Sequence, residues 1–196
     1  MKSRRRAAFH YHSHIIVSLY RNVKCAAPQQ HRHFSVSRPK RTVSPSAAAT
    51  PSGRTARSSG PAVRAMLEDA GFSVTHTAMV PDEQAHISAA LRDCADQRHI
   101  DLIITAGGTG LSPRDVTPEA TLAVLDREIR AIPVAMWMEG LKITPRAMLS
   151  RAVAGMRGRS LIINLSGSEK AARENLSAVI CALKHAMHMI AAEGHG

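Results

Sequence analysis

The chain has 196 residues and a formal net charge of +11, a balance that would suit a nucleic-acid-binding protein. The distribution of charge argues against that class, because residues 1–65 carry 13 Lys and Arg without any Asp or Glu, whereas residues 66–196 carry 13 basic and 15 acidic residues. Aromatic residues make up 3% of the chain, too few for a stacking platform on single-stranded nucleic acid.

Hydropathy and cysteine usage indicate a reduced, cytoplasmic protein. No apolar run approaches the roughly 20 residues that a membrane span requires. The three cysteines, Cys25, Cys94 and Cys181, have neither CxxC nor metal-ligand spacing. We therefore expect buried thiols without disulfides.

Residues 1–57 differ in composition from the rest of the chain. They are rich in Arg, Ser, Pro and Ala, and IIVSLY is a short apolar island among them. Three interpretations stay open: a disordered basic tail, an Arg-rich targeting peptide, or a segment that a wrong start or a shifted reading frame has added. Residues 58–196 form the predicted domain.

Helices and strands alternate from Ser58 onward. Ser59 is a candidate N-cap before a helix that Gly71 ends, and the alternating run FSVTHTAMV predicts a strand. Further helices are expected at about Glu83–Gln97, from Thr117 to about Arg130, in two short pieces around Gly140–Pro145, and from Ser168 to about Ala192. Further strands are expected at Leu102–Thr105, Ala152–Met156 and Ser160–Leu165. This order predicts an α/β fold with a largely parallel sheet.

A glycine-rich turn follows the buried strand at Leu102. Gly107, Gly108 and Gly110 would allow close approach of a phosphate or carboxylate to backbone N–H groups, although a tight turn needs glycines anyway. We expect Thr117 to cap the following helix, with Glu119 in its electropositive first turn.

Two aspartates are candidates for Mg²⁺ binding. Asp115 lies in the loop after the glycines, and Asp82 ends the preceding predicted strand, so a parallel sheet would bring them to one edge. A local pair of Asp115 with Arg114, and a plain helix N-cap at Asp82, explain the same residues without a metal. Gly167, Ser168 and Lys170 begin the last helix and indicate either a second anion site or an ordinary cap.

These residues carry a resemblance to a known family. GGTGLSPRDVTPEAT, together with VPDE upstream and SRAVAGMRG, LIINLSGS and ARENL downstream, resembles the MogA/MoaB family of molybdenum cofactor biosynthesis proteins over about Ser58–Ile190. The resemblance implies a three-layer α/β/α domain, assembled as a homotrimer or homohexamer, that binds molybdopterin.

In the MogA-like branch the resemblance implies adenylylation of molybdopterin by Mg-ATP, with release of pyrophosphate. It places the two functional carboxylates on Asp82 and Asp115 and the nucleotide-side turn on Ser59 and Gly60. It implies that the following residues bind or support the pterin and phosphate: Gly107, Gly108, Thr109, Gly110, Ser112, Arg114, Thr117, Glu119, Gly167 and Ser168.

A second interpretation keeps the fold and molybdopterin binding but not the transfer reaction. Pro45 and Arg57 stand where the family has aspartates, and no good first strand precedes them. IIVSLY and FSVS are the candidates to replace that strand. A DNA-binding function is the third and least favoured alternative, because of the charge distribution.

Overall fold

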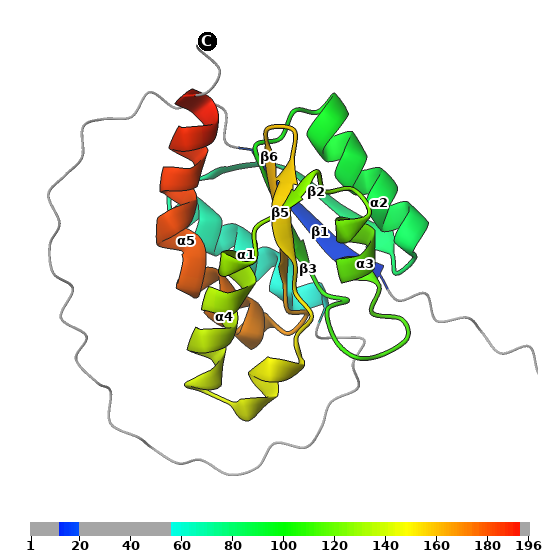
Figure 1. Cartoon of the computed structure of the whole chain (residues 1–196), viewed down its shortest axis with the longest axis vertical. Helices are drawn as coiled ribbons and strands as arrows, with labels where there is room; N and C mark the ends of the chain where they lie inside the picture. The colour runs from blue at the N-terminus through cyan, green and yellow to red at the C-terminus, as the bar shows by residue number, and fades with distance from the viewer. Residues whose placement is uncertain (1–11, 20–55, 193–196) are drawn as a thin grey trace, which may run out of the picture.

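The structure is a computed structural model that describes residues 12–19 and 56–192 (Figure 1). Side chains are described from Ser59 to Ala191. The strands are β1 (His12–Leu19), β2 (Ser73–Pro81), β3 (Leu102–Ala106), β4 (Arg127–Glu128), β5 (Ala154–Arg157) and β6 (Ser160–Leu165). The helices are α1 (Ala56–Asp69), α2 (Gln84–Arg92), the π-helix η1 (Asp93–Gln97), α3 (Thr117–Leu122), α4 (Ala131–Leu141), the 3₁₀-helix η2 (Pro145–Leu149) and α5 (Glu169–Ala192).

One six-stranded sheet has the order β2-β1-β3-β6-β5-β4. Only β3 and β6 pair in parallel, and the other neighbouring strands are antiparallel. The expected largely parallel sheet is therefore wrong, and the sheet is mixed. The short turn at Gly158 makes β5 and β6 an antiparallel hairpin, and β1 and β4 add antiparallel partners.

Strand β1 fills the position between β2 and β3, so residues 15–19 of the island IIVSLY belong to the strand that the domain was expected to lack. His14 pairs with Met79 on one side and with Ala106 on the other. Because β1 is antiparallel to both neighbours, β2 and β3 run in the same direction. The other candidate, FSVS, and Pro45 lie outside the described residues.

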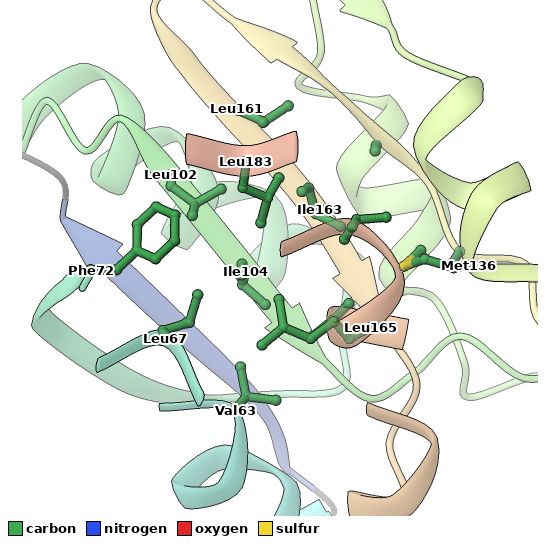
Figure 2. Packing of buried hydrophobic residues seen from close by; sticks show 14 of the residues in the cluster. Val63, Leu67, Phe72, Leu102, Ile104, Met136, Leu161, Ile163, Leu165 and Leu183 are labelled. Atoms are coloured by element: carbon green, nitrogen blue, oxygen red, sulfur yellow. The ribbon is translucent and has the colours of Figure 1, made fainter. Parts of the chain in front are cut away.

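Helices cover both faces of the sheet, which gives the expected three layers. Helices α1, α4 and α5 lie on one face and α2 and α3 on the other (Figure 1). Successive side chains of β3 and β6 point to opposite faces of the sheet. Ile103 and Ile162 face α2 and α3. Figure 2 shows the cluster on the opposite face, which includes Val63, Leu67, Leu102, Ile104, Leu161, Ile163, Leu165 and Leu183.

A buried polar network ties the two central strands to α3. The side-chain amide of Asn164, fully buried in β6, donates to the hydroxyls of Thr105 (2.9 Å) and Thr121 (2.9 Å). Its carbonyl oxygen accepts the backbone N–H of Val153 at 3.3 Å. Buried polar groups cost least when all are paired, so this network fixes where α3 packs beneath the end of β3.

Three local expectations are wrong. Helix α1 begins at Ala56, so Ser59 lies inside it and is not its N-cap. Helix α3 begins at Thr117 with Val116 as N-cap and no capping side chain, and the Thr117 hydroxyl has no partner among the described residues. The helix ends at Leu122, well before Arg130, because the following chain turns to pair β4 with β5.

The cysteines are free where the structure describes them, but only one is buried. Burial raises the pKa of the Cys94 thiol to about 11. Cys181 is exposed, which corrects the expectation of burial, and Cys25 lies outside the described residues. Within residues 12–19 and 56–192, no helix combines the length and apolar character needed to cross a membrane.

Candidate active site

The glycine turn begins where the buried strand β3 ends. Gly107 and Gly108 have φ angles of +113° and +64°, a region that only glycine enters without strain. The N–H of Gly107 donates to the carbonyl of Leu165 in β6 (3.1 Å), which continues the parallel pairing by one more bond. The chain then leaves the sheet and reaches α3 at Thr117.

The carbonyls of three successive residues in this turn accept hydrogen bonds from the protein. Gly108 accepts from the N–H of Thr117 (3.2 Å), Thr109 from the N–H of Arg151 (2.9 Å), and Gly110 from Nε of Arg151 (2.7 Å). A trans peptide points its C=O and the next N–H in opposite directions, and none of these bonds is cis. The N–H groups of residues 109–111 therefore point away from those donors.

These three N–H groups form no hydrogen bond among the described residues. Amides left unbonded at the end of a strand are the kind of donor set that holds a phosphate or carboxylate. The turn therefore provides a preorganised group of donors, which glycine content alone could not establish.

Asp115 folds back over this turn. Its Oδ2 accepts the N–H of Ser112 at 3.0 Å, and its own N–H donates to the Ser112 carbonyl at 2.9 Å. A Cβ on Gly110 would lie 2.9 Å from Oδ2, so the absence of a side chain there makes room for the carboxylate. No hydrogen bond from the described residues occupies Oδ1. The bond to Oδ2 therefore comes from Ser112, and the local pairing of Asp115 with Arg114 stays a prediction.

The turn after β6 lies against the turn after β3, as the parallel pair requires. A Cβ on Gly167 would lie 3.2 Å from the Cα of Gly107. Ser168 caps α5, with its hydroxyl accepting the N–H of Ala171 at 3.3 Å. The N–H of Ser166 donates to the side chain of Asn175 at 3.2 Å, which holds the turn against the first turns of α5.

The two turns border one cleft of about 610 Å³. Residues 108–110 and Asp115 line one side, and residues 166–168 with the start of α5 line the second. The third side comes from α4 and η2 and is largely apolar, with Met136, Trp137, Ile143 and Leu149. Its volume falls in the range of about 300–1,000 Å³ that suits small-molecule sites.

Trp137, the only tryptophan in the chain, contributes an unsatisfied donor to this wall. Its Nε1 is buried and has no partner among the described residues, like the Thr117 hydroxyl and Oε2 of Glu119. Buried polar atoms are paired in the great majority of cases, so an unpaired indole N–H in a cleft wall is a candidate ligand contact.

Cations also border the cleft. The side chain of Lys170 is 80% exposed, and its ammonium is 4.0 Å from a Glu174 carboxylate oxygen. Arg146 lines the opposite wall from η2. Both charges stay accessible to an anionic ligand. No group of three or more His, Cys, Asp and Glu side chains within the described part of the chain could hold a metal by itself.

Comparison with known proteins identifies the family. A family model described as "Probable molybdopterin binding domain" matches residues 41–185. The chain belongs to this family. That match includes both turns, Asp115 and every wall of the cleft.

Three proteins that this chain resembles are 44–50% identical to it over the residues that match. Gephyrin from Dictyostelium discoideum is 48% identical over 117 residues, and the match spans 60% of this chain and 16% of gephyrin. The molybdopterin adenylyltransferase of Haemophilus influenzae is 44% identical over 121 residues, or 61% of each protein. The crystal structure of the molybdopterin biosynthesis enzyme MoaB from Thermus thermophilus has a TM-score of 0.65 at 50% identity, covering 68% of this chain and 84% of that one.

The structure brings most predicted residues of this molybdopterin binding domain together. Six of them line the cleft: Gly108, Thr109, Gly110, Asp115, Gly167 and Ser168. Gly107 is buried behind the turn, and Thr117 and Glu119 lie beneath it in α3. Ser112 and Arg114 are exposed on the loop and do not line the cleft.

Asp82, Ser59 and Gly60 lie apart from the glycine turn and do not line the cleft either. Asp82 follows β2 at the same sheet edge as Gly107, but β1 lies between β2 and β3, so two strand spacings, about 10 Å, separate the strands. Glu83, not Asp82, is the N-cap of α2. Ser59 and Gly60 are buried inside α1.

The sequence interpretation also missed residues at the site. Arg151 was quoted within SRAVAGMRG without a role, yet it contacts the glycine turn through both its backbone and its side chain. Trp137 and Asn175 were missed as well. A lone Arg before a strand, or a Trp in an apolar helix, has no local pattern that distinguishes it from packing.

Proposed function

We propose that this chain adenylylates molybdopterin with Mg-ATP and releases pyrophosphate. One observation supports this most: Thr109 and Gly110 with their unbonded N–H groups, the carboxylate-bearing Asp115 and the capped start of α5 all border one cleft. Two relatives named molybdopterin adenylyltransferases are 44% and 43% identical to this chain over 121 and 115 residues. The chain spans 61% of the Haemophilus enzyme, so the activity of the whole protein is part of the proposal.

In the proposed reaction a phosphate oxygen of molybdopterin attacks the α-phosphorus of ATP. A new P–O bond forms, and the bond from the α-phosphorus to the bridging oxygen breaks, so pyrophosphate leaves with the electron pair. Such a transfer needs alignment and charge stabilisation more than covalent catalysis. The N–H groups of residues 109–111 would donate to phosphate oxygens, with Lys170 and Arg146 as flanking cations.

Asp115 is the residue we propose to hold Mg²⁺. Its Oδ1 is unoccupied by the described residues, and Mg²⁺ prefers one or two carboxylates combined with phosphate oxygens. When bound, Mg²⁺ would supply charge neutralisation to the phosphates. Asp82 stays a second candidate that requires the ligand to extend beyond the cleft toward β2. The apolar wall with Trp137 suits the flat pterin ring.

The test is Asp115→Asn, which keeps size and an oxygen that can accept the Ser112 N–H. We expect an unchanged thermal midpoint and a loss of adenylylation of at least about 100-fold, as for other groups that stabilise charge in the transition state. Asp126→Asn is the matched control, since Asp126 likewise accepts a backbone N–H, from Gly158 at 2.6 Å, but does not line the cleft. Unchanged turnover in Asp115→Asn would refute the proposed role.

The second candidate function is molybdopterin binding without adenylylation. It is favoured by the position of Asp82, Ser59 and Gly60, none of which lines the cleft. Calorimetry separates the two candidates. Binding of both molybdopterin and Mg-ATP supports the enzyme, whereas molybdopterin binding with no response to Mg-ATP supports the binding protein.

A homotrimer or homohexamer in the cytoplasm is part of the same proposal. Exposed apolar side chains on α4, η2 and the connection between them support self-association: Met138, Leu141, Ile143, Met148 and Leu149. Sedimentation equilibrium measures the mass directly, and a monomer at micromolar concentration would exclude this part of the proposal.

A further inference from the structure

Arg151 makes an unusual number of contacts with a single loop. It lies between η2 and β5, with its side chain 34% exposed. Its guanidinium donates to the carbonyls of Gly110 and Asp115 and to the carboxylate of Glu119. Its backbone N–H donates to the carbonyl of Thr109 at 2.9 Å.

These contacts determine which way the turn presents its N–H groups. Of the three carbonyls in the turn that accept hydrogen bonds, those of Thr109 and Gly110 are bonded by Arg151 alone among the described residues. If the Gly110 carbonyl were released, the peptide that joins residues 110 and 111 could rotate, and the turn that lines the cleft at Thr109 and Gly110 would lose its fixed geometry. The donor set thus depends on a side chain that does not line the cleft.

The same guanidinium also holds the backbone of Asp115. It binds the backbone carbonyl of Asp115, while the Asp115 carboxylate bonds to Ser112 on the other side. Glu119 balances the charge of Arg151, and Oε2 of Glu119 is buried with no hydrogen-bond partner in the described part of the chain. Only a planar fork with several donors can serve two carbonyls and a carboxylate together, which a lysine ammonium cannot do in the same geometry.

We propose that Arg151 is a positioning residue that holds the N–H groups of residues 109–111 and the Asp115 carboxylate in the arrangement that binds phosphate. This inference rests on the proposed function for the identity of the ligand. The arrangement itself is a property of the ligand-free chain, so it can be tested without turnover.

The first measurement is hydrogen exchange of the full chain without ligand. In Arg151→Gln we expect the bonded amides of Ser112, Asp115 and Thr117 to exchange at least about tenfold faster, because the loop loses its anchor. Amides in β3 and β6 should keep their rates. Arg157→Gln is the matched control, since Arg157 also binds a carboxylate and a carbonyl but at the opposite end of β5.

The second measurement is the affinity of each variant for inorganic pyrophosphate by calorimetry. We expect Arg151→Gln to bind at least about tenfold more weakly, and Arg151→Lys to keep the thermal midpoint but not the affinity. Added methylguanidinium should partly restore binding in Arg151→Ala, a rescue that a merely stabilising role would not produce. Arg157→Gln should bind like the parent chain.

The outcomes separate this inference from the proposed function. Faster loop exchange in Arg151→Gln without adenylylation by the parent chain would refute the enzyme and retain the positioning role. Parent-like exchange of Ser112, Asp115 and Thr117 in both Arg151→Gln and Arg151→Lys would overturn the positioning role, whatever the activity. Equal loss of pyrophosphate affinity in Arg157→Gln would overturn it as well.

Discussion

Two arginines flank strand β5 and do similar chemistry at opposite ends. Arg157 donates to both carboxylate oxygens of Asp96, at 2.9 and 2.6 Å, and to the carbonyl of Val124 at 2.9 Å. Arg151 likewise combines a carboxylate, Glu119, with backbone carbonyls. Each arginine joins β5 to segments that lie more than thirty residues away.

The surroundings of the two arginines differ. Beside Arg157, the N–H of Gly158 donates to the carboxylate of Asp126 at 2.6 Å. Around Arg151 three backbone N–H groups and the nearby indole N–H of Trp137 have no partner within the described part of the chain. Because unpaired buried or oriented donors are costly, their concentration at one end of the strand marks the end adapted to a ligand.

Gly110→Ala is expected to have the largest effect at the Arg151 end of β5. The new Cβ would lie 2.9 Å from Oδ2 of Asp115 and displace the carboxylate, and displacements near 1 Å can cost about 100-fold in rate. We expect adenylylation to fall by about that factor with little loss of stability, because φ at Gly110 is not positive and only the end of a side chain must move.

The matched control is Gly155→Ala in β5. Its Cβ would lie 2.4 Å from the carbonyl oxygen of Arg127, a backbone atom that cannot rotate away. Such overpacking costs about 1–3 kcal/mol of unfolding free energy, measured by urea denaturation, without affecting the turnover of the folded protein. If Gly110→Ala lowered the unfolding free energy and left the adenylylation rate unchanged, the two ends of β5 would respond to a new methyl group in the same way.

Trp137→Phe tests the unpaired indole N–H, with an intermediate effect. If that N–H donates to the bound ligand, its removal should weaken molybdopterin binding by about 2- to 10-fold, the range of a neutral hydrogen bond. Calorimetry is the measurement, since the variant has no tryptophan fluorescence. Met138→Leu, on an exposed part of the same helix, is the control. Unchanged affinity in Trp137→Phe would leave the indole a packing role only.

The smallest effect is expected at the Arg157 end. Hydrogen bonds from Arg157 hold the pKa of Asp96 below its ordinary value of 3.8. The folded state therefore binds a proton at Asp96 less readily than the unfolded state. The stabilisation is fully present above pH 3.8 and is lost as the pH falls below it. Asp96→Asn should reduce this acid dependence of the thermal midpoint slightly, and an unchanged curve would show that solvent screens the pair completely.

Local sequence patterns predicted the glycine turn after β3, the strands β5 and β6 and the start of α5 near Ser168. Each depends on residues close together in sequence. The role of Arg151 was missed because its partners are 32, 36 and 41 residues away, and nothing near it in sequence indicates them.

The errors in secondary structure have the same origin. TPEATLAVLDREI has helical composition, yet the helix ends at Leu122 because Arg127 pairs with Met156 in a strand. A distant partner there outweighs local propensity. Likewise, IIVSLY is apolar enough for a strand, but its antiparallel direction is fixed by β2 and β3.

The place of β1 has a consequence for the order of folding. β1 is first along the chain, but both of its neighbours come later, with all of α1 in between. Contacts between distant segments form slowly, since a long loop must close before any bond stabilises it. A growing chain would therefore make residues 12–19 first and bond them only after β2 and β3 exist. We expect the middle of the sheet to be completed late, with the edges of β2 and β3 open to other chains until then.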